Sequence, residues 1–133
     1  MARFLERPLI ARLATSDGDR PRVLPIWFWW DGRDVWMETS PTFANYRVLR
    51  RNPRAALTID EALSGLAMRA VVMRGRVEIV EEPQDEVMAT VQRIHERYLS
   101  PEERASEAGR AMLLGSHVLL RFTPDRTISW DTT

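Results

Sequence analysis

The sequence predicts a mainly β protein of the α+β type: an antiparallel barrel of six or seven strands, with short helices and one helical insert. Two observations support this fold class. Short segments that alternate apolar and polar residues recur along the chain, and clusters of Gly, Pro, Asp and Ser separate several of them. Strands joined by such short turns favour an antiparallel barrel over a parallel sheet.

The expected strands follow one another in a simple order, and a few residues mark how they connect. In chain order they are 9–15, 22–30, 34–40, 55–60, 69–82, 117–124 and 127–131. Pro25 cannot donate a ladder hydrogen bond, so it marks an edge strand, a bulge or an interrupted pairing. Asp31 and Gly32 signal a hairpin. Gly75 predicts a β-bulge that bends the longest strand.

Short helical segments complete the predicted fold. One helical turn is expected before Pro8, and segment 41–53 fits a short amphipathic helix. Pro83 opens the longest helical stretch, and residues 100–103 have the pattern of a helix start with proline at its first position. The apolar positions that define the two longer helices are Phe43, Tyr46 and Leu49 in the first and Val87, Val91, Ile94 and Tyr98 in the second.

Length and composition bound the class of protein. At 133 residues the chain is expected to form one domain, residues 1–133. Its 19 basic and 19 acidic residues cancel, so no overall field favours nucleic acid or an anionic membrane. The absence of cysteine excludes disulfides, thiolate metal sites and a cysteine nucleophile. No signal peptide and no apolar run of membrane-spanning length are recognised, so the cytoplasm is the expected compartment.

No constellation of side chains in the sequence points to acid–base or metal chemistry. His95 and His117 are the only histidines, neither has a second metal ligand at useful spacing, and both are interpreted as structural. The carboxylates around Pro83 are expected to complement the positive end of the following helix. No glycine-rich phosphate loop of a known spacing is present. The sequence therefore predicts no catalytic side chain and no metal site.

Four aromatic residues in succession, Trp27 to Trp30, stand out from this background. Because a strand alternates its faces, such a run is expected to place large rings on both sides of the sheet. One face can belong to a core. The other must be covered by a helix, a second chain or a flat ligand.

The chain contains no lysine, so a side-chain cation that holds an anion here is expected to be a guanidinium. Arg47, Arg50 and Arg51 lie in the short helical segment that follows Thr39 and Ser40. Two interpretations stay open. The arginines form a solvated helix face, or they converge with the two hydroxyls and the helix N-terminus on an anion site.

Taken in order, five segments resemble the pyridoxamine 5′-phosphate oxidase-like superfamily: LIARLAT, RPRVLPIWFWWDGRDVWMETS, NYRVLRRNPRAALTID, VVMRGRVEIVEEP and ISWD. The resemblance covers nearly the whole chain and is closest to the small bacterial members. It implies a split β-barrel that binds a flavin or a deazaflavin, in a homodimer with two cofactor sites at the subunit interface. The expected activity is that of an FMN-dependent oxidoreductase that transfers a hydride to or from a small planar substrate. The cofactor then carries the hydride, in agreement with the lack of catalytic side chains.

The resemblance also implies which residues surround the cofactor. Along the ring edge it places Pro25, Ile26 and Trp27. Near the ribityl chain and the phosphate it places Glu38, Thr39 and Ser40. From the second subunit it brings Arg69 and Ala70, and near the C-terminus it places Trp130 at the border of the site.

One position departs from the family's pattern. The family often has a basic residue, usually lysine, about seven positions before the Asn or Asp of the NPR-like element, and here that residue is Asn45. Arg47 or Arg50 is expected to hold the cofactor phosphate in its place. Two alternatives accompany the FMN-dependent enzyme: a reductase of the same fold that uses an 8-hydroxy-5-deazaflavin coenzyme, and a non-catalytic module that binds or stores a flavin.

Overall fold

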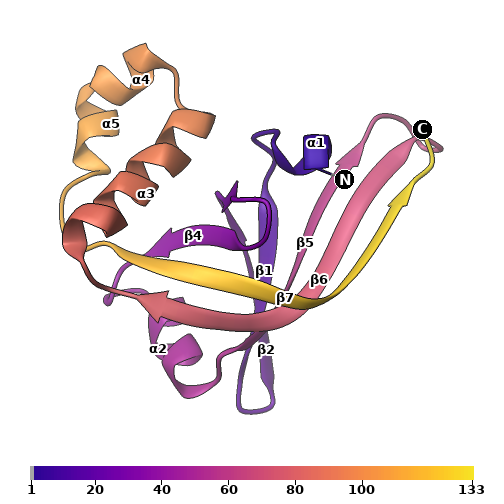
Figure 1. Ribbon diagram of the computed structural model, residues 1–133, viewed down its shortest axis with the longest axis horizontal. Helices are drawn as coiled ribbons and strands as arrows, with labels where there is room; N and C mark the ends of the chain where they lie inside the picture. Colours follow the sequence, from indigo (N-terminus) through magenta and orange to yellow (C-terminus); the bar gives the residue numbers. More distant parts are fainter. Residues whose placement is uncertain (1) are drawn as a thin grey trace.

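The computed structural model describes residues 2–133 and confirms the mainly β fold (Figure 1). These residues form one seven-stranded sheet with the order β2-β1-β5-β6-β7-β4-β3, in which neighbouring strands are antiparallel. The strands are β1 (Ala11–Asp17), β2 (Arg20–Ile26), β3 (Trp29–Trp30), β4 (Val35–Thr39), β5 (Arg54–Ala62), β6 (Met68–Val80) and β7 (Val118–Asp131). The helices are α1 (Ala2–Leu5), α2 (Ala44–Arg51), α3 (Gln84–Tyr98), α4 (Pro101–Ala105) and α5 (Glu107–Ala111).

Residues 27–28 carry the chain from one edge of the sheet to the other. β2 and β3 lie at opposite edges, so the strand expected at 22–30 is interrupted there. The edge position of β2 confirms one of the interpretations of Pro25. Because the aromatic run is not one strand, its rings do not simply alternate: Phe28 is fully buried, whereas the three tryptophans of the run are partly exposed.

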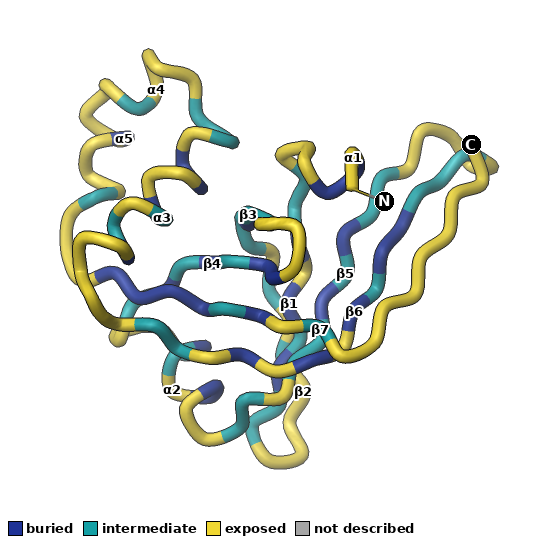
Figure 2. The backbone as a smooth tube through the Cα atoms, in the orientation of Figure 1, coloured by how far each residue is buried: buried dark blue, intermediate teal, exposed yellow. Residues whose placement is uncertain are grey.

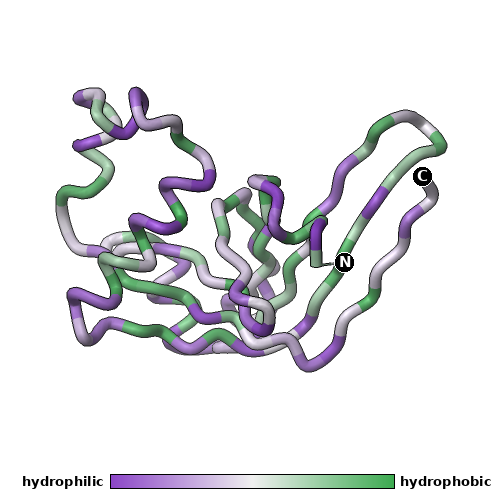
Figure 3. The backbone as a smooth tube through the Cα atoms, turned by 45° about the horizontal axis from the view of Figure 1, so that its top comes forward, coloured by the Kyte–Doolittle hydropathy of each residue, from purple (hydrophilic) through white to green (hydrophobic). Residues whose placement is uncertain are grey.

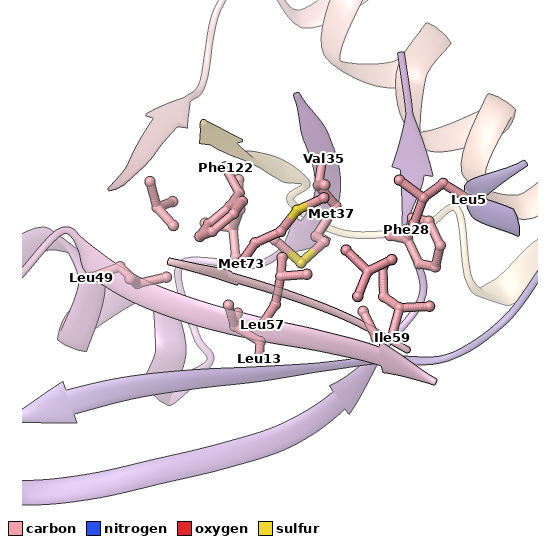
Figure 4. Packing of buried hydrophobic residues seen from close by; sticks show 14 of the residues in the cluster. Leu5, Leu13, Phe28, Val35, Met37, Leu49, Leu57, Ile59, Met73 and Phe122 are labelled. Atoms are coloured by element: carbon pink, nitrogen blue, oxygen red, sulfur yellow. The ribbon is translucent and has the colours of Figure 1, made fainter. Parts of the chain in front are cut away.

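The core lies inside the curled sheet. This cluster contains Phe28 with side chains from β1, β4, β5, β6 and β7, and it extends from Leu5 of α1, beside Phe28, to Leu49 of α2 at the other end (Figure 4). A second, smaller cluster forms between α3 and the other face of β4 and β7, with Val87, Val91 and Leu119 at its centre. β7 therefore begins buried between the two clusters, whereas its second half is exposed (Figure 2).

The strands after α2 differ from the prediction mainly at their ends. A connection is present within the expected segment 61–68, but it is shorter, residues 63–67, because β5 continues to Ala62, which pairs with Met68. The segments 117–124 and 127–131, expected as two strands, form the single strand β7 of 14 residues. Together the ends of β5, β6 and β7 project as an arm, residues 59–72 and 126–131, away from helices α3 to α5 (Figure 1).

The β-bulge predicted at Gly75 is present and explains why β7 does not end at Pro124. Arg74 pairs with Arg126 but Gly75 pairs with Pro124, so the extra residue is Asp125 of β7. Gly75 is required by close contact: a Cβ there would lie 2.1 Å from the carbonyl oxygen of Thr123. The bulge allows Pro124 and the turn-like sequence around it to lie within one continuous strand.

Helix α2 buries a different face from the predicted one. The sequence suggested Phe43, Tyr46 and Leu49, but the buried side chains are Asn45, Val48 and Leu49. The helix begins at Ala44, so Phe43 precedes it and remains 59% exposed. The prediction was right for Leu49 and wrong for Phe43, which precedes the helix, and it did not place Asn45 and Val48 on the buried face.

The helical insert agrees with its sequence pattern. Val87, Val91 and Ile94 of α3 are buried, and α4 starts with a capping box in which Ser100 and Glu103 bond each other's backbone N–H groups. No helix within residues 2–133 is long and apolar enough to cross a membrane.

Candidate flavin-binding groove

Two adjoining hollows open beside β2 and β4. The β2 hollow has a volume of about 460 Å³ and is lined mainly by residues 24–27. The β4 hollow has a volume of about 520 Å³ and is lined by residues from segments 38–43 and 112–117. Glu38 and Phe43 line both, so the two hollows form one groove. Each volume lies in the range of small-molecule sites.

The structure brings seven of the predicted site residues to this groove. Those that line the β2 hollow are Pro25, Ile26, Trp27, Glu38 and Asn45. Those that line the β4 hollow, besides Glu38, are Thr39 and Ser40. They come from β2 and the residue after it, from β4 and the residue after it, and from α2, and they line the same groove although β2 and β4 are not neighbours in the sheet.

The two arginines expected at the phosphate lie in different surroundings. Arg47 lines neither hollow, but its Nη1 donates over 3.4 Å to the carbonyl oxygen of Thr42, a residue that lines the β4 hollow. Arg50 donates to the Tyr46 hydroxyl at 2.9 Å and lies 3.7 Å from a carboxylate oxygen of Glu81. Like Arg47, Arg50 lines neither hollow, and none of its bonds within residues 2–133 is to a residue that does.

Asn45 lies on the buried face of α2 and is only 5% exposed. The Thr39 hydroxyl donates to its side-chain oxygen over 2.5 Å, which ties the start of α2 to the end of β4. The position that often carries a cation in the family therefore carries a neutral side chain with its oxygen already bonded. Any charge that balances a bound anion in the groove comes from another residue.

Arg69, Ala70 and Trp130 are not part of the groove of their own chain. They line a third hollow, of about 220 Å³, on the arm. Ala70 and Trp130 pair across β6 and β7, and Nε of Arg69 lies 3.4 Å from the carboxylate of Asp131.

The two histidines that sequence reasoning interpreted as structural share one carboxylate. Glu38 lies between them, with Oε1 bonded to Nε2 of His95 and Oε2 lying 3.0 Å from Nδ1 of His117. Both imidazoles are buried, with exposed fractions of 3% and 9%. An ionised carboxylate only accepts hydrogen bonds, so each imidazole presents an N–H to it. Nε2 of His117 is buried and has no hydrogen-bond partner among residues 2–133.

Helix α3 holds the Trp27 ring in place. Tyr98 stacks on the indole with ring centroids 4.8 Å apart and planes at 3°, and His95 meets it edge-on at 6.0 Å. The Tyr98 hydroxyl donates to the carbonyl oxygen of Leu9 at 2.6 Å and accepts from the N–H of Phe28 at 3.1 Å. Burial raises the pKa of Tyr98, so its hydroxyl remains protonated at neutral pH. The indole therefore has a defined orientation in the wall of the β2 hollow.

Sequence reasoning missed the contribution of α3 and of the segment before β7. His95 and Tyr98 are three residues apart and share a helix face, a spacing that could have flagged a polar pair on an otherwise apolar stripe. Glu38 pairs with Leu119 of β7, and His117 lies two residues before Leu119. Its side chain therefore reaches Glu38. No group of three or more His, Cys, Asp or Glu side chains in the described part of the chain is arranged to hold a metal ion.

Comparison with known proteins assigns the fold to a family. Residues 1–131 match the family model described as pyridoxamine 5′-phosphate oxidase. The chain belongs to the pyridoxamine 5′-phosphate oxidase family. The resemblance noted in the sequence is confirmed, and so is the split β-barrel. This is the fold of flavin- and deazaflavin-binding proteins.

Several solved structures superpose closely on the chain. A conserved hypothetical protein, Rv2991 from Mycobacterium tuberculosis, has a TM-score of 0.82 at 28% identity, over 98% of this chain and 82% of that chain. A protein named F420 reductase has a TM-score of 0.71 at 27% identity, over 95% and 94%. A FAD-binding protein from Mesorhizobium loti shares the fold with a TM-score of 0.68 at 20% identity, over 96% and 88%. No curated protein sequence matches the chain.

The residues of the groove fit a flat ring joined to an oxyanion. Trp27 offers a fixed aromatic wall in the β2 hollow. The β4 hollow is lined by Ser40 and Thr42 and by His117, whose Nε2 has no hydrogen-bond partner within residues 2–133. These are groups that bind a phosphate or a carboxylate.

Proposed function

We propose that the protein is an oxidoreductase that binds FMN in the groove and transfers a hydride to or from a small planar substrate. The observation that carries the proposal is the junction of the two hollows at Glu38 and Phe43, with the Trp27 wall on one side and hydroxyls on the other. FMN has the same succession of parts, a flat ring followed by a hydroxylated chain and a phosphate. Membership of the pyridoxamine 5′-phosphate oxidase family supports the proposal.

Each end of the groove has its own task in this proposal. The segment from Pro25 to Trp27 contacts the ring edge, mainly through its backbone. Thr39 and Ser40 assist at the ribityl chain and the phosphate. Arg47 supplies charge from beside Thr42, and Arg50 is the second candidate for that charge although it bonds Tyr46 in the structure described here.

When bound, the flavin supplies the hydride chemistry, and the chain supplies position and electrostatics. Tyr98 and His95 hold the Trp27 indole in one orientation. The fixed indole therefore restricts the orientations that a bound flavin ring can take. No side chain of this chain needs to act as a nucleophile.

A homodimer completes the site in this proposal. The arm exposes large apolar side chains, with Leu66 at 89% and Ile128 at 49% exposed, and its tip is apolar (Figure 3). Arg69, Ala70 and Trp130 lie on the same arm, away from the groove of their own chain. Their contribution to a cofactor site therefore requires a second copy, whose groove they border.

A deazaflavin is the second candidate cofactor, and one observation favours it. The similar structure named F420 reductase covers 95% of this chain at 27% identity, and F420 is an 8-hydroxy-5-deazaflavin coenzyme. A non-catalytic module that binds or stores a flavin is the third candidate.

The absorption spectrum of the purified protein, followed by titration with FMN and with the deazaflavin coenzyme, tests these candidates. The account predicts saturable binding of one of the two, with one site per chain, and reduction of the bound cofactor by a nicotinamide or another hydride donor. Binding without any turnover of a reductant supports the storage module. Failure of both cofactors to bind overturns the proposal.

A further inference from the structure

His117 has one ring nitrogen that the protein leaves without a partner. Its Nδ1 lies 3.0 Å from Oε2 of Glu38, whereas its Nε2 is buried and makes no hydrogen bond within residues 2–133. A buried polar atom without a partner costs free energy, so such atoms are few in native proteins and call for an explanation. Since His117 lines the β4 hollow, a molecule bound there can supply the missing partner.

We propose that His117, oriented by Glu38, binds an oxyanion of the ligand through Nε2 in the β4 hollow. The carboxylate accepts the Nδ1–H, which fixes the ring and leaves Nε2 for the ligand. Ser40, Thr42 and Ser116 line the same hollow and add hydroxyl donors. The inference rests on the proposed function, because it takes the oxyanion to be the phosphate of the cofactor.

His117 can supply the positive charge that Asn45 lacks. Asn45 is neutral, and its side-chain oxygen already accepts from Thr39. The hollow that Asn45 lines and the hollow that His117 lines share Glu38 and Phe43. A protonated His117 therefore places a positive charge in the β4 hollow. Asn45 of α2, in the adjoining β2 hollow, supplies no charge.

The charges around this nitrogen make the binding depend on pH. Glu38 comes from β4, His95 from α3 and His117 from the segment before β7, while Arg47 of α2 bonds the carbonyl oxygen of Thr42. Glu96 of α3 pairs with an arginine of α4 instead. With both imidazoles neutral the Glu38 cluster carries one negative charge, and with both protonated it carries one positive charge. Since Nε2 donates to an oxyanion only when it carries a proton, an oxyanion binds more tightly at lower pH.

The first experiment observes the two imidazoles directly by ¹H–¹⁵N NMR of the full chain. There are only two histidines, so the variant His95→Gln assigns both sets of ring signals. Inorganic phosphate at pH 6.5 is expected to shift the His117 signals saturably and more than those of His95. The response should weaken at pH 8.5. A His117 ring that does not respond to phosphate overturns the inference.

The second experiment compares FMN with riboflavin, which lacks the phosphate, in the wild type and in His117→Gln. Glutamine keeps a hydrogen-bond donor but cannot carry the charge. At pH 6.5 the wild type is expected to prefer FMN, and His117→Gln should lose about tenfold or more of that preference, with riboflavin affinity unchanged. The ionisation of FMN itself is the same for both proteins and cancels in this comparison. Glu38→Gln provides a second variant, expected to reduce the same preference, if His117→Gln does not fold.

The outcomes separate this inference from the proposed function. If neither flavin nor deazaflavin binds the wild type, the proposed function fails, and with it the assignment of the oxyanion to a cofactor. If both flavins bind and His117→Gln retains the preference for FMN and its pH dependence, only the inference fails. A third outcome is that His117→Gln weakens the binding of FMN and of riboflavin equally, while His117 of the wild type responds to inorganic phosphate. This outcome overturns the assignment to the cofactor phosphate and points to an oxyanion of the substrate.

Discussion

The indole of Trp27 stacks on the phenol ring of Tyr98 with ring centroids 4.8 Å apart and planes within 3° of parallel. The contact joins the segment that crosses between the two sheet edges to the last turn of α3. One face of the indole is therefore occupied by protein. Because Trp27 also lines the β2 hollow, the remaining surface of its ring is what a ligand in that hollow meets.

Replacing Arg47 by alanine should weaken FMN binding selectively. The guanidinium bonds the carbonyl oxygen of Thr42, which lines the β4 hollow, and a charge-assisted hydrogen bond contributes about 1.5–3 kcal/mol. The expected loss for FMN is about tenfold to a hundredfold, whereas riboflavin should bind both proteins equally. Isothermal titration provides the measurement. Arg33→Ala is the control, because that side chain is 78% exposed in the β3–β4 turn.

An Arg47→Ala protein with wild-type affinity for FMN would contradict the role given to this arginine. The phosphate charge would then have to come from His117 alone or from a rearranged Arg50. The pH dependence separates these two residues, since a guanidinium stays charged throughout the range in which an imidazole titrates.

Much of the fold follows from local patterns. The expected hairpin at Asp31 and Gly32, the edge position of Pro25 and the bulge at Gly75 are all present, because each depends on backbone properties of the residue itself. The division of β7 into two strands was predicted wrongly. Pro124 resembles a strand break in the sequence, and only the pairing with β6 shows that a bulge accommodates it.

The candidate site was only partly accessible to sequence reasoning. The family resemblance placed Trp27, Glu38 and Thr39 in one region, where the structure also has them. The bonds from Glu38 to His95 and His117 span 57 and 79 residues, and no local spacing encodes them. They arise from the packing of α3 on β4 and from the pairing of β4 with β7, which are consequences of the whole topology.

The carboxylate of Asp31 should make stability depend on acid pH. Burial alone would raise its pKa, but hydrogen bonds from Nε1 of Trp36 and from the backbone N–H groups of Asp34 and Arg33 outweigh burial and lower it. A group with a lowered pKa in the folded state stabilises the fold above its unfolded pKa, near 4, and loses this contribution as the pH falls.

Asp31→Asn is therefore expected to lower the free energy of unfolding slightly at pH 7, because solvent screens this exposed carboxylate, and to reduce the decline in that free energy between about pH 5 and pH 2. Urea unfolding at several pH values measures both effects. The prediction fails if the difference in free energy of unfolding between the variant and the wild type is the same at every pH.

Gly75→Ala should destabilise the protein by about 2 kcal/mol or more, because the added Cβ would lie 2.1 Å from the Thr123 carbonyl oxygen and the backbone must move. Gly65→Ala is a matched control. A Cβ at Gly65 meets nothing within 4 Å, so that change should be nearly neutral. Thermal unfolding of the two variants provides the comparison, and equal melting temperatures would show that the bulge tolerates a side chain.

The exposed apolar side chains of the arm predict that the protein forms a dimer. Sedimentation of the wild type at micromolar concentration is expected to give a dimer, because an obligate interface of about 2,000 Å² or more leaves no stable folded monomer. Ile128→Asp, at a side chain that is 49% exposed on the arm, should shift the equilibrium toward smaller or unfolded species. Val23→Asp is a comparison at a side chain that is 71% exposed on β2, outside the arm. A folded wild-type monomer would count against the dimer and against an interface site.

The most direct test of the account is the affinity of Trp27→Ala for FMN and for the deazaflavin coenzyme, measured by fluorescence titration beside the wild type and Trp29→Ala. Trp29 lines neither hollow and lies under the guanidinium of Arg93, so its replacement should leave affinity nearly unchanged. The account predicts that one cofactor binds the wild type and quenches its tryptophan fluorescence, and that Trp27→Ala binds it about three- to tenfold more weakly, as expected for a lost aromatic contact of about 0.5–1.5 kcal/mol. Equal affinity of the wild type and Trp27→Ala for both cofactors, or no binding at all, would contradict it.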